Sequence, residues 1–143
     1  MYRKILVALE NSQTDATLLA HVKQLATRLE SELLLLHVAD GWVARNFDKL
    51  KLAESEEMKA DRAYLEKVAE GMRAAGLSAR THLALGDPPQ QILNIAESEK
   101  CDLIAMGSHG HRFVGDLILG STIHEVRHRT STPVLVIRGA AET

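Results

Sequence analysis

The sequence predicts an α/β protein, built as a doubly wound parallel sheet of five strands with helices on both faces. Three observations support this fold class. Four short runs are apolar almost throughout, which is typical of strands covered on both faces. Segments with apolar residues at helical spacing alternate with these runs. Alternation of strand and helix along a chain requires parallel strands joined by right-handed crossovers.

Five runs are the expected strands. Four of them are continuous in their hydrophobicity and are expected to be covered on both faces: residues 5–9, 33–38, 102–106 and 133–137. The fifth, residues 79–85, alternates with polar Arg80 and His82 and is expected nearer an edge.

Two helices are expected in the first half of the chain. The first carries apolar residues from Leu18 to Leu29 at helical spacing, and Ser12 or Thr14 is available to cap its start. The second carries an apolar stripe at 65–72 and ends at Gly76, where glycine commonly closes a helix. A charged connection, residues 40–53, precedes it and predicts no regular element.

Two further helices are expected in the second half. Asp87 followed by Pro88 is typical of an N-cap with proline in the first turn. The last helix is expected from about Ser121 to His128, with apolar residues between them facing the sheet.

Length and composition indicate a soluble globular protein. We expect residues 1–143 to form a single domain. The net charge of -2 argues against a nucleic-acid partner, and no run approaches the roughly 20 apolar residues of a membrane span. The lone Cys101 cannot form an internal disulfide, which favours a reducing compartment. We therefore expect a cytoplasmic protein without a membrane or nucleic-acid partner.

A glycine pattern follows the fourth expected strand. The chain reads G-S-H-G at 107–110 and, after nine residues, G-S-T at 120–122. Glycine permits close backbone approaches that a Cβ would forbid. Gly120 and Ser121 are expected to open the last helix, where unpaired amides and the helix dipole attract phosphate. The hydroxyl of Ser121 or Thr122 offers a further hydrogen bond to a phosphate oxygen or a metal-bound water.

This pattern resembles the ATP-binding signature of the universal stress protein family. The resemblance covers nearly the whole chain, because four segments are similar to that family's strands in order and spacing: residues 2–9, 34–38, 101–110 and 133–138. It implies the strand order 3-2-1-4-5 and a crevice between Glu10 and Gly107. It also implies a homodimer joined through residues 133–138, an unidentified protein partner and a regulatory role in stress response.

Carried over by position, the resemblance implies a site for ATP, alone or with Mg²⁺ or Mn²⁺. The corresponding residues flank adenine, lie near the sugar, or contact ribose and phosphate: Ala8 and Val38; Glu10; and Gly107, Gly110, Gly120, Ser121 and Thr122. His109 and Arg112, in the loop between the glycines, are further candidates, Arg112 as a cation for the triphosphate. Glu10-Asn11 departs from the family's usual Asp-Gly, and the longer side chain of Glu10 requires any sugar contact to be re-aimed.

Catalytic alternatives remain open but weaker. The same pocket could support slow ATP hydrolysis or phosphotransfer, although no P-loop lysine accompanies the glycines to stabilise a γ-phosphate. The pentapeptide H-E-V-R-H at 124–128 matches a zinc-hydrolase pattern in which His124 and His128 are ligands. A solvated helix face explains these histidines more simply. We therefore expect no catalytic residue, and at most slow ATP turnover.

Overall fold

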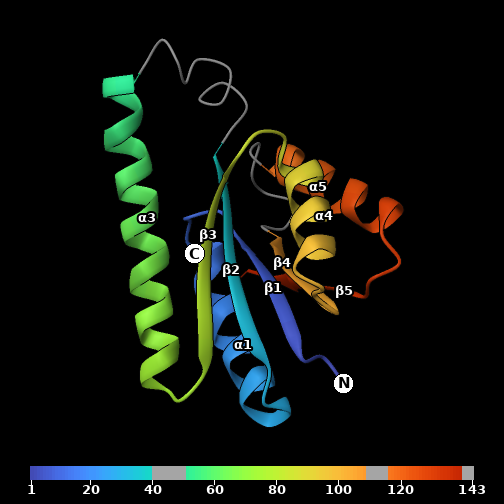
Figure 1. Cartoon of the computed structure of the whole chain (residues 1–143). Coiled ribbons are helices and arrows are strands. Elements are labelled where there is room, and N and C mark those ends of the chain that lie inside the picture. Colours follow the sequence, from blue (N-terminus) through green and yellow to red (C-terminus); the bar gives the residue numbers. More distant parts are fainter. Residues whose placement is uncertain (40–50, 109–115, 140–143) are drawn as a thin grey trace.

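The computed structural model describes residues 1–39, 51–108 and 116–139, and only the backbone of 51–55 and 116–120. It confirms the predicted fold class, a five-stranded sheet in the order β3-β2-β1-β4-β5 in which every strand pair is parallel (Figure 1). The strands are β1 (Lys4–Leu9), β2 (Glu32–Ala39), β3 (Ser78–Leu85), β4 (Leu103–Ser108) and β5 (Val134–Arg138). β3 lies at one edge, as its alternating pattern predicts.

Helices connect the strands and cover both faces of the sheet. They are α1 (Thr14–Leu29), α3 (Lys51–Ala74), α4 (Pro88–Ser98) and α5 (Asp116–Arg129). α1 and α3 lie on one face, and α4 and α5 lie on the other (Figure 1). None of the helices in the described ranges combines the length and the apolar character needed to cross a lipid bilayer.

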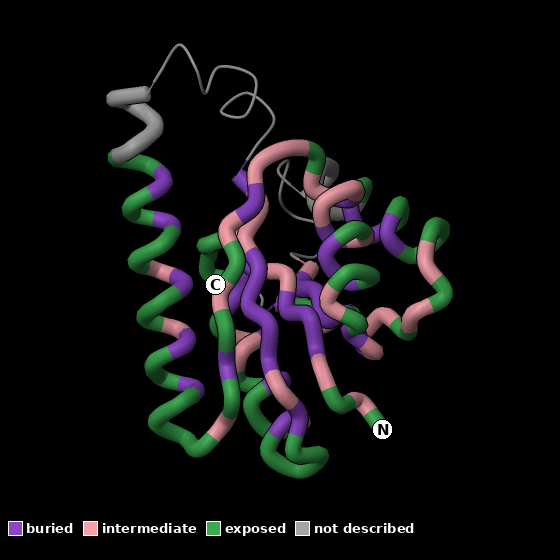
Figure 2. The backbone as a smooth tube through the Cα atoms, in the orientation of Figure 1, coloured by how far each residue is buried: buried purple, intermediate pink, exposed green. Residues whose placement is uncertain are grey.

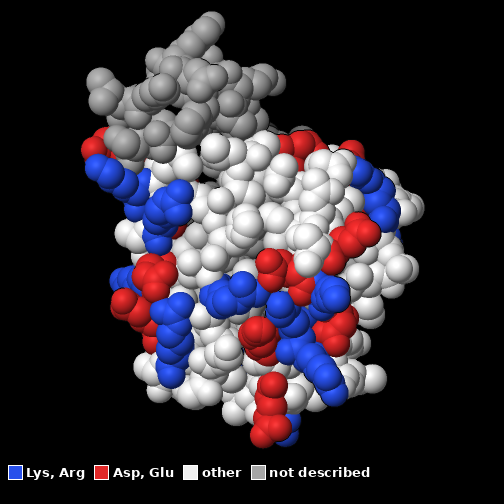
Figure 3. Space-filling model, in the orientation of Figure 1, with Lys and Arg blue, Asp and Glu red and all other residues white. Residues whose placement is uncertain are grey.

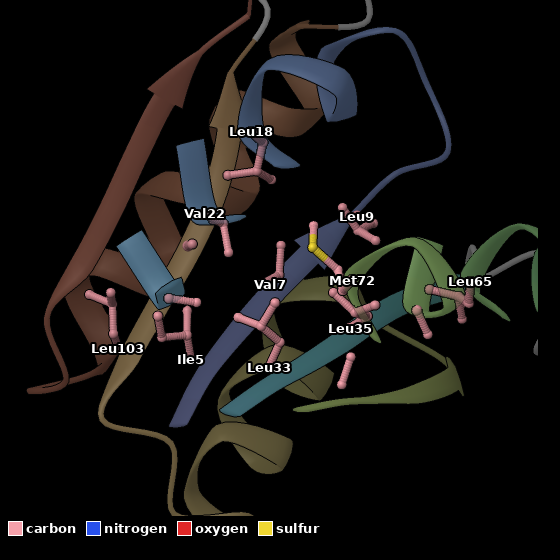
Figure 4. Close-up of a cluster of buried hydrophobic side chains, with 14 residues drawn as sticks. Ile5, Val7, Leu9, Leu18, Val22, Leu33, Leu35, Leu65, Met72 and Leu103 are labelled. Atoms are coloured by element: carbon pink, nitrogen blue, oxygen red, sulfur yellow. The ribbon is translucent and has the colours of Figure 1, made fainter. Parts of the chain in front are cut away.

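Successive strand residues point to opposite faces of the sheet and so divide the core in two. Ile5 and Val7 of β1 pack with α1 and α3, in a cluster of 14 buried residues shown in Figure 4. Leu6, between them, packs with α4 and α5 on the other side. The middle strands are buried along most of their length (Figure 2), which is why their sequences are continuously apolar.

Two helix starts in the first half of the chain differ from the sequence expectation. The N-cap of α1 is Gln13, which makes no capping hydrogen bond through its side chain, so neither Ser12 nor Thr14 is the cap. The Ser12 hydroxyl instead accepts a hydrogen bond from the Thr14 amide at 3.3 Å. α3 begins at Lys51, inside the connection predicted to be irregular. Asp87 does cap α4, since its carboxylate accepts from the Gln90 amide at 3.2 Å.

Charged side chains tie together the amino ends of the strands. Lys4 of β1 lies 3.4 Å from Glu99, whose carboxylate also pairs with Arg80 of β3 at 2.6 Å. The hydrogen bond from Arg80 lowers the pKa of Glu99 below its ordinary value. Figure 3 shows basic and acidic side chains interleaved over this part of the surface. The opposite, carboxyl end of the sheet instead contains a mostly apolar cavity.

Candidate functional site

The carboxyl end of the sheet contains a notch above β1. The ladder between β1 and β2 ends at the pair Leu9↔His37, and the ladder between β1 and β4 ends at Ala8↔Met106. Both neighbours continue past these pairs, β2 to Ala39 and β4 to Ser108. The chain also reverses its winding direction between β1 and β4. Ligands of open α/β sheets bind at such a switch point.

A cavity of about 290 Å³ occupies this notch. Its size is near the lower end of the roughly 300–1,000 Å³ typical of small-molecule sites. The lining residues come from β1 and the turn after it, β2, β4 and the helices α1, α4 and α5: Ala8, Leu9, Glu10, Asp15, Leu36, His37, Val38, Pro88, Ile92, Met106, Gly107 and Thr122. Most are apolar, and the carboxylates of Glu10 and Asp15 are the acidic groups among them. This combination suits a flat apolar ring that carries polar substituents.

Five of the ten residues expected to bind the cofactor lie together around this cavity. They are Ala8, Glu10, Val38, Gly107 and Thr122. Ser121 is exposed and does not belong to the described lining. His109, Gly110 and Arg112 fall outside the described residues, as does the side-chain environment at Gly120. The contacts of all ten with a nucleotide stay predictions.

The start of α5 corrects one part of the sequence interpretation. The helix begins at Asp116, so Gly120 and Ser121 lie in its second turn rather than opening it. Only the first four amides of an α-helix lack a partner inside the helix. Aspartate is favoured at helix starts, and an internal glycine costs only about 1 kcal/mol, so the sequence permits the earlier start. The amides of Gly120 and Ser121 are therefore not free helix-end donors.

Gly107 has a packing role that the motif does not reveal. A Cβ at this position would lie 2.8 Å from Cγ2 of Thr14, at the start of α1. Real Cβ atoms avoid carbon contacts this short because optimal separations are about 3.5–4.0 Å. The absence of a side chain at Gly107 thus lets α1 approach the end of β4. Glycines with the same role in helix–strand packing occur in dinucleotide-binding folds.

The turn after β1 shows how the chain accommodates Glu10-Asn11. Asn11 has a φ of 61°, in the left-handed region that glycine enters freely and asparagine enters more readily than most residues. Replacement of the family's usual glycine therefore keeps this backbone conformation. The Glu10 carboxylate, on the cavity wall, accepts a hydrogen bond from the Ser12 hydroxyl.

Asp15 is a cavity residue that the sequence reasoning missed. Asp15 is 2% exposed, and its carboxylate accepts hydrogen bonds from the amides of Glu10 at 3.1 Å and Asn11 at 2.8 Å. The Tyr64 hydroxyl of α3 donates to it at 2.6 Å. Burial and then this hydrogen bond raise the pKa of Tyr64 far above its ordinary value, so the hydroxyl remains a donor. The available signal was an acidic residue in the first turn of a helix that points at the switch point.

His37 also lines the cavity. Its Nδ1 lies 2.8 Å from the carbonyl oxygen of Leu9, and because a carbonyl only accepts, Nδ1 carries the hydrogen. Its Nε2 lies 3.5 Å from the carboxylate of Asp61 in α3. Both ring nitrogens thus face protein partners, as expected of a satisfied histidine in a core strand.

The histidines of α5 lie on an exposed face. The rings of His124 and His128 meet edge to face with centroids 4.2 Å apart. Glu125, the base in the zinc-hydrolase interpretation, lies 3.4 Å from Arg129. Within residues 1–39, 51–108 and 116–139, no three His, Cys, Asp or Glu side chains are grouped to hold a metal ion. The zinc interpretation has no support from this part of the chain.

The chain is a doubly wound α/β protein with a cavity at the switch point of its sheet. A sequence model of the universal stress protein family matches residues 1–138, and the chain belongs to that family. Universal stress protein MJ0577 of Methanocaldococcus jannaschii is 30% identical over 158 aligned positions, covering 96% of each chain. The solved structure of MJ0577 superimposes with a TM-score of 0.83 over 99% of both chains.

Two solved universal stress proteins with bound nucleotides share the fold at lower identity. One, from Archaeoglobus fulgidus in complex with dAMP, has a TM-score of 0.70 and 21% identity, covering 95% of this chain and 98% of its own. The other, in complex with cAMP, has a TM-score of 0.70 and 20% identity, covering 97% and 98%. At these identities the likeness establishes a common fold.

Proposed function

We propose that this chain binds an adenine nucleotide, ATP, in the cavity at the carboxyl ends of β1, β2 and β4. The observation that carries the proposal is the position of Ala8, Val38 and Glu10 around one cavity at the switch point. The dAMP and cAMP complexes of two proteins with this fold make adenine nucleotides the ligands to test. Bound nucleotide would alter the surface that a protein partner recognises, as in a regulatory module of stress response.

The chemistry of the described lining assigns the two ends of the ligand. The adenine ring would lie between the apolar walls near Ala8 and Val38, and the ribose hydroxyls near the Glu10 carboxylate. The phosphates would leave the cavity past Gly107 and Thr122. The described lining contains no lysine or arginine, so the phosphate charge needs another partner. We therefore propose that Mg²⁺ or Mn²⁺ neutralises the phosphate charge, together with Arg112 and His109, which lie outside the described residues.

Calorimetric titration of nucleotide-free protein with ATP, ADP and AMP, with and without Mg²⁺, tests the site. The cavity-filling variant Val38→Phe should lower affinity at least about tenfold, because the ring would occupy the space intended for adenine. The matched control Leu29→Phe adds the same ring at the exposed end of α1 and should bind as wild type. Equal affinity of the wild type and Val38→Phe would place the nucleotide elsewhere and refute the proposed site.

We also propose that two copies associate through β5. This strand lies at the edge of the sheet, where unpaired backbone groups can accept a further strand. Val136 is 38% exposed, and with Val134 and Ile123 it borders a groove of about 500 Å³. Light scattering should give a dimer mass for the wild type and a monomer mass for Val136→Asp. A monomeric wild type would exclude this assembly.

A further inference from the structure

Helix α3 supports the cavity without lining it. Of the described lining residues, none belongs to α3. Nevertheless Tyr64, in the middle of α3, donates a hydrogen bond to the buried carboxylate of Asp15, 49 residues away in the sequence. Asp15 in turn accepts from the backbone amides of Glu10 and Asn11. A continuous chain of hydrogen bonds therefore joins α3 to the turn that carries Glu10 on the cavity wall.

A second contact from α3 reaches the same turn. The side-chain amide of Asn11 donates to the carboxylate of Asp61 at 3.3 Å, and Asp61 is 8% exposed. Asn11 is thus held through its backbone by Asp15 and through its side chain by Asp61. Its left-handed conformation is open to asparagine more readily than to most residues, but a constraint is still needed to hold it there rather than in the commoner conformations. The contacts from Asp15 and α3 supply that constraint.

We propose that Asp15 and Tyr64 are positioning residues for the ligand in this cavity. This inference rests on the proposed function, because the ligand is taken to be an adenine nucleotide. Tyr64 fixes the orientation of Asp15, and Asp15 holds the Glu10–Asn11 turn in the conformation that places Glu10 on the cavity wall. Since Asp15 itself lines the cavity, a change in its orientation alters the site directly.

The docking of α3 does not depend on the Tyr64 hydroxyl. Leu65, Ala69 and Met72 of α3 are at most 5% exposed and belong to the core cluster on this face of the sheet, where Figure 4 shows Leu65 and Met72. Removal of one oxygen therefore leaves the helix in place and acts on the turn alone. A residue with only a structural role would change stability, whereas a positioning residue changes the affinity of the folded protein.

Calorimetric titration of the Tyr64→Phe variant with ATP and AMP tests the inference. Loss of a hydrogen bond to a buried carboxylate should weaken nucleotide binding about tenfold while the protein stays folded. The matched control is Tyr2→Phe. It removes the hydroxyl of the chain's second tyrosine, which precedes β1 and lies at the opposite end of the sheet from the cavity. The control should bind like wild type.

Rescue by glycine distinguishes positioning from general weakening. Asn11→Gly allows the left-handed backbone without steric cost, so the turn should depend less on the clamp from Asp15. Because Asn11→Gly also removes the side-chain contact with Asp61, its single variant is the reference, and Tyr64→Phe should cost less affinity in that background than in the wild type. In two-dimensional NMR spectra, the amide signals of Glu10 and Asn11 should move in Tyr64→Phe and remain in Tyr2→Phe.

The outcomes separate this inference from the proposed function. A wild type that binds neither nucleotide overturns the proposed function and the positioning role with it. A wild type that binds, with unchanged affinity in Tyr64→Phe, overturns the positioning role alone. Unmoved amide signals of Glu10 and Asn11, or an equal loss of affinity from Tyr64→Phe in the wild type and in Asn11→Gly, also overturn it.

Discussion

Gly107→Ala tests whether glycine is required here so that α1 can pack against β4 or so that a ligand can approach the backbone. The added Cβ would lie 2.8 Å from Cγ2 of Thr14, and its next neighbours, the Ile137 carbonyl oxygen and Leu18 Cβ, are at 3.8 Å. The conflict is therefore confined to one methyl group on α1. That methyl is buried, because Thr14 is only 6% exposed, and the helix cannot shift without disturbing Leu18 in the core.

The cost follows from this geometry. A carbon–carbon contact at 2.8 Å is about 0.7 Å or more inside the favourable separation. Overpacking of this kind in a well-packed core typically costs about 1–3 kcal/mol. For a chain of this size, each kcal/mol lowers the melting temperature by roughly 2–4 °C. Urea denaturation of Gly107→Ala should show the same loss in the free energy of unfolding.

The matched background is Thr14→Ser, which keeps the hydroxyl and removes Cγ2. In that background Gly107→Ala should cost almost nothing, or gain about 0.4–1 kcal/mol by restricting the unfolded chain. A double-mutant cycle gives the coupling directly. An equal cost of Gly107→Ala in both backgrounds would refute the packing explanation. Weaker ATP binding by the double variant than by Thr14→Ser alone would show that the ligand also needs the glycine.

Three other predictions concern residues away from the cavity. Gly71→Ala should stabilise the protein by about 0.5–1 kcal/mol in urea unfolding, since Gly71 lies inside α3 with nothing within 4 Å of an added Cβ; a loss of stability would contradict this. Burial acts to raise the pKa of Asp102, but hydrogen bonds from the amides of Arg3 and Lys4 outweigh it and hold the pKa below its ordinary value. The stability that this carboxylate contributes is complete above about pH 4 and is lost as pH falls through the lower folded-state pKa, so Asp102→Asn should flatten the acid dependence of unfolding; an unchanged slope would exclude this contribution. Burial raises the pKa of the Cys101 thiol to about 11, so at pH 8 a disulfide reagent should react far more slowly with native than with urea-unfolded protein; equal rates would show that the thiol is accessible.

The fold could be predicted from the sequence because its signals are local. Runs such as 33–36 are continuously apolar because β2 is covered on both faces, and every one of these four leucines is at most 2% exposed. Asp87-Pro88 and Gly76 mark helix ends through their own backbone preferences, and both occur where expected. The predicted start of α5 was wrong because Gly120 was interpreted as the residue that opens the helix, whereas a helix tolerates an internal glycine.

Some residues of the candidate site could likewise be predicted from the sequence, and others only from the tertiary structure. Ala8, Glu10 and Gly107 were identified from the resemblance to the universal stress protein family, and all three line the cavity at the carboxyl end of the sheet. Only the tertiary structure brought Tyr64 and Asp61 of α3 to the turn after β1, since hydrogen bonds between residues about 50 positions apart leave no local pattern. The clash that requires glycine at position 107 likewise depends on where α1 packs. Local backbone preferences and burial determined the elements of this protein, and the packing of helices against the sheet determined which side chains meet at the cavity.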